Sequence, residues 1–422
     1  MSRQTIIIGA GVVGVTIAWE LARRGVQVSV VDAADGPGGA CSHANAGLIA
    51  PGHVDALATP ATLIEGLSSL HRRTGPFRLS PHPAVLPYAL RMARSSTPAR
   101  AQRHGDLLRE LAVESLHRHV ELPRLGVQTG IRRAGSLDVL SSKARAAAAR
   151  AEAARPGDQR RDVTLAGHDT HAGQLLNAEQ VAALEPALAP VPGAIRHSQD
   201  AHVDSREYLA GMVRACAELG VPVRWGVRVR RLERCSGARL ELVAPGVRME
   251  ADHVVIAAGL ESARIGASLG LRLPLISGKG YVVDLADSGV ELGRPVTFME
   301  DRVVATPYDD VLRLCGTFEL GGVPDTIDAR RVEGILAVGR RRLPGLRTDN
   351  VVQMWAGQRP CSADGMPLIG RSRVHPGVAV AAGHGMWGLT LAPATARLVA
   401  DDLCEQRGVP APLSADRFTA TR

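Results

Sequence analysis

Short runs of apolar residues recur along the chain and predict strands of a parallel sheet that is buried on both faces. The first run covers 5–8 (TIII) and the second covers 26–31 (VQVSVV). Between them, apolar residues recur at the spacing of an α-helix, and the pattern ends at Gly25, a residue type that commonly terminates helices. The start of the chain therefore predicts a strand–helix–strand unit.

Two later segments have the same character. Residues 251–262 (ADHVVIAAGLES) contain a buried strand that ends in small residues, and 377–408 contain a strand, a glycine turn and a helix. Proline is compatible with a helix in its first turn, so we expect Pro393 to lie there. The N-terminus of this last helix carries free N–H groups and partial positive charge, which favour a negatively charged ligand.

The middle of the chain predicts further strands and helices. Residues 126–140 and 275–320 have strand character. The remaining predictions are helices and loops over 54–125, an Ala/Arg-rich helix over 143–155, an exposed loop over 155–174, and a helix over 205–220 with Ser205 as its N-cap.

Glycines follow the first strand in a G-x-G-x-x-G pattern formed by Gly9, Gly11 and Gly14. The first permits a tight turn, the second lets the backbone approach a pyrophosphate, and the third lets the helix pack closely on the sheet. Asp32 ends the second strand, where a carboxylate can accept hydrogen bonds from both ribose hydroxyls. Because strand, glycines, helix, strand and acid fall in register, the segment predicts a dinucleotide site.

The distribution of the other glycines favours a flavin over a nicotinamide. Gly36, Gly38 and Gly39 precede the segment CSHANAGLIAPG, whose small residues let the backbone pass close to a flat ligand. The nucleotide-binding part is also assembled from three separated pieces of chain. Aimed at the flavin pyrimidine ring, the last helix would stabilise the negative charge of the reduced flavin.

Composition bounds the class of protein. The 422 residues are 45% hydrophobic and 22% charged, which indicates a globular chain with two domains. No apolar run is long enough to cross a bilayer, and the N-terminus enters a strand without room for a secretory leader. We therefore expect a cytoplasmic protein with reduced cysteines.

The charge and the cysteine spacing indicate whether the protein binds nucleic acid, a membrane surface or a metal ion. The net charge is +8, but the arginines are dispersed and aromatics make up 3%, which argues against nucleic acid. A solvated basic surface is the favoured interpretation, and attraction to the anionic inner face of a membrane stays open. The six cysteines and the histidines show no metal-binding spacing, so no metal is predicted.

Several segments together resemble one enzyme superfamily. They include IIIGAGVVGVTIAWELARRG, SHANAGLIAPG, ALEPAL, KGYVVDL, WAGQRPCSADGMPLIGRS and AAGHGMWGLTLAPATARLVADDL. The chain is similar to the FAD-dependent D-amino acid oxidase superfamily, and within it to bacterial D-amino acid dehydrogenase small subunits and glycine-oxidase-like enzymes.

The resemblance implies an α/β fold (α+β overall) with a Rossmann-like FAD-binding domain and a second, mainly antiparallel-sheet substrate domain. We expect the first domain to comprise 1–85, 200–274 and 350–422, and the second to comprise 86–199 and 275–349. The motif and this resemblance together predict FAD contacts at Gly9, Gly11, Val12, Val13, Gly14, Asp32, Ala33, Ser42, Ala46, Gly47, Leu48, Val229, Ala258, Gly259, Gly383, Gly385, Met386, Gly388, Leu389 and Thr390.

The resemblance also places Arg359 over the flavin, where related enzymes bind the substrate carboxylate. A guanidinium matches a carboxylate with two parallel hydrogen bonds. The alternative is that Arg359 pairs with Asp364 or another acid and only holds its loop. Tyr281 is expected to donate to the carboxylate, and Lys279 or Tyr308 to line the site, although packing roles fit these three equally.

The resulting hypothesis is oxidative deamination of D-amino acids to 2-oxo acids and ammonia, by hydride transfer from the α carbon to flavin N5. Electrons would pass to a quinone or another carrier, or to oxygen. Met386 and Trp387 are apolar where glycine-oxidase-like relatives place a polar or basic side chain, which favours substrates with apolar side chains, although a packing role in the core fits both residues equally. Secondary amino acids (sarcosine, proline, hydroxyproline), glycine, and a flavoprotein subunit that acts through assembly with partners remain as alternatives.

Overall fold

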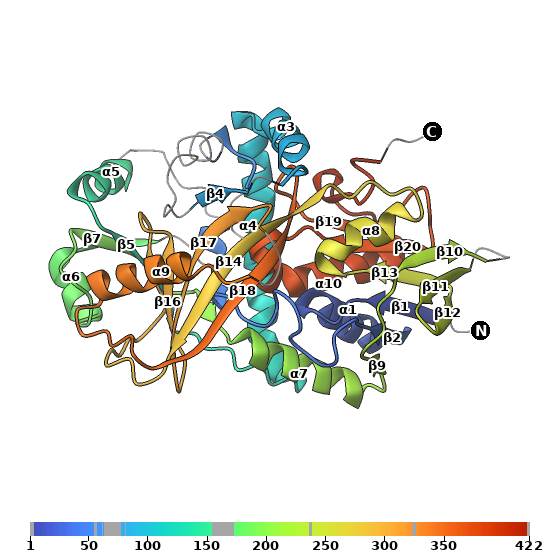
Figure 1. The fold of residues 1–422 in the computed structure, drawn as a ribbon, viewed down its shortest axis with the longest axis horizontal. Helices are drawn as coiled ribbons and strands as arrows, with labels where there is room; N and C mark the ends of the chain where they lie inside the picture. Colours follow the sequence, from blue (N-terminus) through green and yellow to red (C-terminus); the bar gives the residue numbers. More distant parts are fainter. Residues whose placement is uncertain are drawn as a thin grey trace.

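A computed structural model describes residues 4–54, 57–60, 62, 77–80, 82–153, 173–235, 239–322 and 326–419 of the chain. Two large sheets dominate it, one at each end of an elongated molecule (Figure 1). One sheet is mainly parallel and the other mainly antiparallel, so the expected mixed α/β architecture is confirmed.

The six-stranded sheet contains the predicted nucleotide-binding segments. Its order is β19 (Leu368–Arg371), β20 (Val378–Ala382), β13 (His253–Ile256), β1 (Gln4–Ile8), β2 (Gln27–Val31) and β9 (Val223–Arg224). All pairings are parallel except that of β19 with β20. The chain leaves β1 for β2 on one side, while β13 lies on the other side of β1. This change of direction is where open α/β sheets bind ligands.

Helices from four regions of the sequence cover this sheet. They are α1 (Val12–Arg23), α4 (Pro98–Glu121), α7 (Ser205–Glu218) and α10 (Gly388–Glu405). Their apolar side chains share one buried cluster, in which Ile17, Leu116 and Leu391 belong to different helices. The predicted helix over 205–220 is confirmed, but its N-cap is wrong: the Asp204 carboxylate, not Ser205, accepts from the Arg206 N–H.

Pro393 lies inside α10, beyond the first turn, so the prediction for this residue was wrong. A proline there cannot donate to the carbonyl four residues earlier, which is that of Leu389. His119 Nε2 of α4 contacts this oxygen at 3.0 Å, and the next N–H, that of Ala394, donates to Ser115 Oγ. Side chains of α4 therefore satisfy the backbone groups that the proline disturbs, which sequence periodicity alone does not show.

The second sheet has nine strands. Along its main path they are β18 (Val351–Ser362), β14 (Leu275–Leu285), β17 (Leu312–Leu320), β16 (Val303–Pro307), β15 (Val296–Phe298), β5 (Ser136–Leu140), β7 (Gly193–His197) and β6 (Gln174–Asn177), while β4 (Phe77–Leu79) pairs with β17. One face packs against α9 (Ala329–Arg342) in a buried apolar cluster.

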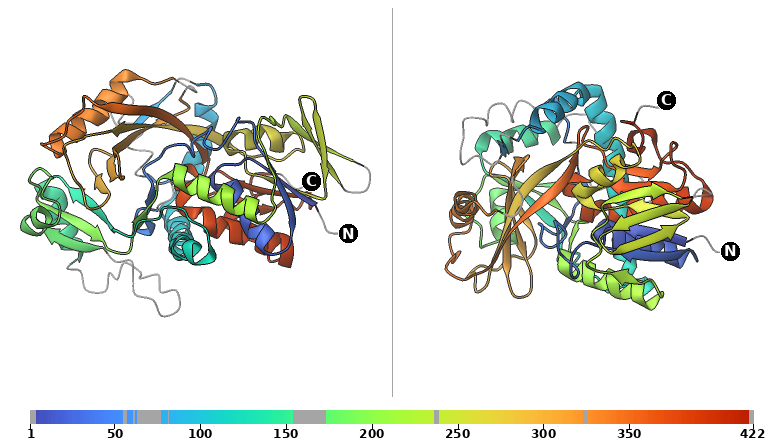
Figure 2. Two further views of the ribbon diagram at one scale, coloured as in Figure 1. Left: turned by 90° about the horizontal axis from the view of Figure 1, so that it is seen from below. Right: turned by 45° about the vertical axis from the view of Figure 1, so that its right-hand side comes forward.

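Smaller elements complete the molecule. They are β3 (Leu48–Ile49), β8 (Ala201–His202), β10 (Arg231–Arg234), β11 (Leu240–Ala244), β12 (Val247–Ala251), α3 (Val85–Ser95), α5 (Lys143–Ala153), α6 (Ala178–Leu184) and α8 (Ser262–Ala267), with single helical turns η1 (Pro51–His53) and η5 (Gly385–Trp387). The β10–β12 sheet lies at the end of the molecule opposite to α6 and α9 (Figures 1 and 2). Every described helix is too short or too polar to cross a bilayer.

The predicted domain boundaries stay a prediction. Segments assigned to each expected domain pack against elements of the other. Strand β18, within the expected FAD-binding range, pairs along its length with β14. Conversely, α4, within the expected substrate-domain range, packs on α10 and α1. Most of the predicted loop over 155–174 lies outside the described residues.

A buried arginine connects the two halves. Arg313 on β17 is fully buried and donates from Nε and Nη2 to the Asp284 carboxylate of β14, at 2.7 and 2.8 Å. Its remaining contacts cross to the other half, where it donates to the Asn45 carbonyl and reaches Asp204, the cap of α7. Burial of this guanidinium is tolerated because two carboxylates surround it.

We expect His119 to make stability acid-sensitive. Burial lowers the pKa of His119 to about 4, from 6.5, so the unfolded chain takes up this proton at a higher pH than the folded protein. Its contribution is complete above pH 6.5 and is lost as the pH falls towards 4, by up to about 3 kcal/mol. His119→Gln keeps a donor for the Leu389 carbonyl but does not titrate.

Urea unfolding of both proteins between about pH 7 and pH 4.5 measures this difference. His202 and His384, whose pKa values burial also lowers, are common to both proteins and cancel in the comparison. An equal loss of stability in the two proteins would contradict the assignment.

Candidate FAD and substrate site

The glycine turn after β1 is sterically closed to larger residues. Gly9 has φ +110°, a conformation that favours glycine, and a Cβ there would lie 2.4 Å from the Ala257 carbonyl oxygen. A Cβ on Gly14 would lie 1.9 Å from the Gly9 carbonyl oxygen. The first and third glycines thus permit the tight turn and the close helix–sheet packing that the motif predicts.

Asp32 and Ser42 converge on the same turn. The Asp32 carboxylate accepts from the N–H groups of Ala10 and Ala34, at 2.6 and 2.8 Å, and stays half-buried. Ser42 Oγ accepts from the Val12 N–H at 3.2 Å, at the N-terminus of α1. Each carboxylate oxygen accepts more than one hydrogen bond, so Asp32 retains capacity for ribose hydroxyls.

The carboxyl ends of parallel strands meet at one edge of the sheet, and this edge gathers the predicted FAD contacts. Gly9 follows β1, Ala258 and Gly259 follow β13, and Gly383 follows β20. The Val227 N–H donates to the Asp32 carbonyl, which brings the chain leading to Val229 to the end of β2.

The segment containing Ala46, Gly47 and Leu48 is fixed from two sides. Thr390 Oγ1 of α10 donates to the Leu48 carbonyl at 3.0 Å, and Thr306 Oγ1 of β16 donates to the Ala46 carbonyl at 2.8 Å. Gly47 has φ +69°, and a Cβ there would collide with the Tyr308 hydroxyl. The remaining expected contacts lie in the first turn of α1 (Val12, Val13), after β2 (Ala33), in η5 (Gly385, Met386) and in the first turn of α10 (Gly388, Leu389).

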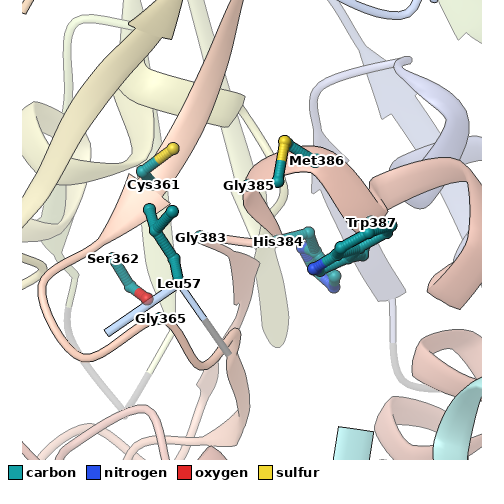
Figure 3. A pocket seen from close by; sticks show the side chains of 9 residues that line it. All are labelled: Leu57, Cys361, Ser362, Gly365, Gly383, His384, Gly385, Met386 and Trp387. Carbon is teal, nitrogen blue, oxygen red and sulfur yellow. The ribbon is translucent and has the colours of Figure 1, made fainter. Parts of the chain in front are cut away.

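A pocket lies between the end of β18 and the turn that leads into α10 (Figure 3). Its lining includes Leu57, Cys361, His384, Met386 and Trp387. His384 Nε2 contacts Thr395 Oγ1 at 3.0 Å, and burial lowers the pKa of this imidazole to about 4. Neutral histidine and apolar side chains make this a weakly polar pocket.

Arg359 lies on β18, two residues before Cys361. Its guanidinium lies against Gly280 of β14, where a Cβ would come within 2.1 Å of Nη2. Nη1 makes long hydrogen bonds of 3.4 Å to the carbonyls of Gly278 and Thr317, and the Phe318 ring centroid is 5.9 Å from the guanidinium carbon. Glycine at 280 thus makes room for the guanidinium.

Within the described residues, Arg359 forms no ion pair, whereas Asp364 pairs with Arg417 through two bonds of 2.7 Å. The structural alternative in which Arg359 pairs with Asp364 is therefore wrong. The nearby cysteine thiols do not compensate the positive charge of Arg359 either. Burial raises the pKa of Cys361 to about 12 and also raises that of Cys41 and Cys315, although Arg359 opposes the shift in all three.

Tyr281 lies on the opposite face of the sheet from Arg359. Strand residues alternate between faces, and Gly278 pairs with Arg359 while Tyr281 packs in the cluster under α9. Its hydroxyl donates to Glu319 at 3.4 Å, and burial raises its pKa to about 12. Lys279 shares this face, with Nζ 5.3 Å from the Tyr281 ring centroid. The structure therefore does not bring either residue together with Arg359.

His43 and Tyr308 lie where the two halves of the molecule meet. The His43 ring lies 4.4 Å from that of Trp355, and its Nε2 contacts the Gln353 amide of β18 at 2.7 Å. Tyr308 donates to the Val203 carbonyl at 3.3 Å and packs behind Gly47. Two features of the site were not identified from the sequence, the Arg313 network and the recess at Gly280. For the Arg313 network, the available signal was an arginine within the apolar strand VLRLCGTFEL.

The residues at the sheet edge fit FAD: the turn leaves no space for side chains, an acid ends β2, and the N-terminus of α10 faces the same edge. Residues 4–402 match the family described as DAO, FAD dependent oxidoreductase. The chain belongs to this family. It is accordingly an FAD-dependent oxidoreductase, as the sequence predicted.

Similar proteins agree with this assignment. The D-amino acid dehydrogenase of Paramagnetospirillum magneticum is 32% identical over 99% of both chains. The glycine oxidase of Geobacillus kaustophilus superposes with a TM-score of 0.70 at 24% identity, over 100% of this chain and 99% of that one. The L-α-glycerophosphate oxidase of Mycoplasma pneumoniae with FAD bound gives 0.73 at 16% identity, over 99% and 98%. The two structures share the fold.

We expect Gly14→Ala to reduce FAD content, because its methyl group would displace α1 from the glycine turn. The ratio of flavin to protein absorbance after purification should fall by roughly tenfold or more. Gly334→Ala is the matched control, because a Cβ at Gly334 meets no atom within 4 Å. Full FAD occupancy in Gly14→Ala would contradict the placement of the cofactor.

Proposed function

We propose that this protein oxidises D-amino acids to 2-oxo acids and ammonia, and that Arg359 binds the substrate carboxylate. The observation that carries the proposal is the guanidinium itself, which lies half-buried over Gly280 without a carboxylate partner among the described residues. A cation in such a place is costly unless an anion joins it. The carboxylate of an amino acid supplies that anion with matching geometry.

The chain contributes positioning more than proton transfer. When bound, FAD would supply the hydride-acceptor chemistry for the substrate α carbon, and water would hydrolyse the resulting imino acid to the 2-oxo acid and ammonia. Arg359 has five N–H donors, and the long bonds to the Gly278 and Thr317 carbonyls use Nη1 alone. Nε and Nη2 donate to no carboxylate or carbonyl of the described chain, so they are available to hold the substrate in one orientation.

A substrate that binds with its amine neutral, its ammonium proton released to water, needs no strong base, because the neutral amine releases hydride without further proton removal. The histidines of the flavin-side segments fit this view. Burial lowers the pKa of both His43 and His384, with Arg206 adding to the effect at His43, so each imidazole stays neutral near pH 7. We assign them to the lining of the site and not to general-base catalysis.

The weakly polar pocket supports substrates with apolar side chains. Met386 is 45% exposed at its rim, and Leu57 and Trp387 line it. A second cation at position 386 would favour small or acidic substrates, and methionine offers none. The D configuration is supported by the name of the Paramagnetospirillum relative, which aligns over 99% of both chains.

The activity is tested with the purified FAD-bound protein, an artificial electron acceptor, and a panel of D- and L-amino acids, glycine, sarcosine and proline. We expect D-amino acids with apolar side chains to bleach the flavin fastest. Preference for sarcosine or proline would favour the secondary-amine alternative, and no bleaching by any compound would refute the proposal. Reoxidation rates with oxygen and with a quinone identify the acceptor.

Arg359→Ala should lower kcat/KM by roughly a hundredfold or more, with an increase in KM, while FAD stays bound. The reason is that the substrate carboxylate loses its partner, whereas the cofactor-binding edge is untouched. Steady-state kinetics and the flavin absorbance measure the two effects separately.

Tyr281→Phe is the matched control on the same sheet. Because Tyr281 lies on the opposite face, we expect kcat/KM to change by no more than about twofold. A large loss in Tyr281→Phe together with unchanged kinetics in Arg359→Ala would show that the carboxylate binds elsewhere.

A further inference from the structure

A second group of chemically active side chains lies away from the candidate site. His53, Asp138 and His197 come from η1, β5 and β7, and one ligand atom of each lies within 4.8 Å of those of the other two. Four strands of the sheet separate β5 from β18, which carries Arg359. The residues are widely separated in sequence, so motif spacing gave no sign of them.

The sheet register explains how two of the three residues meet. Ser136 of β5 pairs with His197 of β7, and Asp138, two residues further along β5, faces the same side of the sheet. His197 Nε2 contacts Asp138 Oδ2 at 3.1 Å. Both side chains are more than nine-tenths buried.

His53 does not belong to the antiparallel sheet that carries Asp138 and His197. It ends η1, which follows β3, and its Nε2 lies 2.9 Å from Asp138 Oδ1. Gly52 and Gly173 leave space beside the His197 ring, since a Cβ on either would come within about 3 Å of it. Two imidazole nitrogens thus converge on one carboxylate.

In the described part of the chain, histidines are the counter-charges that the ion pairs of this region show. Asp138 and Asp200 are both buried, and Asp200 accepts a hydrogen bond from Ser136 at 2.6 Å. No lysine or arginine of the described residues forms an ion pair with either carboxylate; the ion pairs of Asp138 are with the two histidines. A divalent cation would balance this negative charge.

We propose that His53, Asp138 and His197 bind a divalent transition-metal ion such as Zn²⁺. Imidazole and carboxylate are ligands that zinc accepts, and neighbouring donors around a tetrahedral zinc lie ~3.3 Å apart. The contacts of 2.9 and 3.1 Å are close to that spacing. The ion would tie the segment after β3 to the antiparallel sheet, with water in the fourth position.

The test is metal binding by the FAD-loaded full-length protein, independent of amino acid oxidation. Chelator-treated protein is incubated with zinc, desalted and analysed by mass spectrometry for metal. Wild type should retain about one zinc per chain, and Co²⁺ should give the visible absorption of a tetrahedral site. His197→Ala and Asp138→Asn should each weaken zinc binding by at least roughly tenfold.

Controls separate loss of the site from loss of the fold. His82→Ala removes an exposed histidine elsewhere and should bind zinc as wild type does. Flavin absorbance and circular dichroism check folding, and His53→Gln serves if His197→Ala does not fold. Zinc should raise the melting temperature of wild type but not of the ligand variants. No zinc retained by wild type, or equal retention by wild type and ligand variants, would overturn the proposal.

Discussion

The arrangement of the two halves depends on the contacts that the fully buried Arg313 guanidinium makes with both of them. It joins Asp284 of the antiparallel sheet to Asp204 and Asn45 beside the parallel sheet. Removal of Arg313 or of Asp284 would leave the other charge in the interior without its two-bond partner, so the contact fixes orientation more than it adds net stability. With that orientation fixed, β18 runs past the turn into α10, and Arg359 comes to lie near the edge where the cofactor-binding segments meet.

Local rules predicted the cofactor-binding half well. The glycine turn, the flanking strands and Asp32 are close in sequence, and each residue type there has a direct steric or electrostatic reason. The geometry bears this out at Gly9 and Gly14, where no side chain fits. The role of Arg359 stays a prediction, which the family resemblance and the position of an arginine at the end of an apolar strand suggested together.

The sequence failed where a tertiary contact decides the outcome. Pro393 is tolerated beyond the first turn because His119 and Ser115, on a helix far away in sequence, replace what it removes. Tyr281 was expected to donate its hydroxyl to the substrate carboxylate, but only the register with β18 shows that Tyr281 and Arg359 face opposite sides of the sheet. Asp204 precedes Ser205, and both residue types cap helices well, so local preference did not distinguish them.

Strand β17 contains a bulge opposite Lys279 and Tyr281, and this bulge determines on which side of the sheet the acidic side chain of Glu319 lies. Between their partners Glu319 and Gly316 the strand contains one more residue than β14 does, and Thr317 adopts φ +64° to accommodate it. In a regular ladder Phe318 would stand opposite Lys279, and Glu319 would turn to the side of the sheet where the Arg359 guanidinium lies. A single-residue bulge therefore keeps an internal acid away from the Arg359 guanidinium, where the substrate anion is proposed to bind.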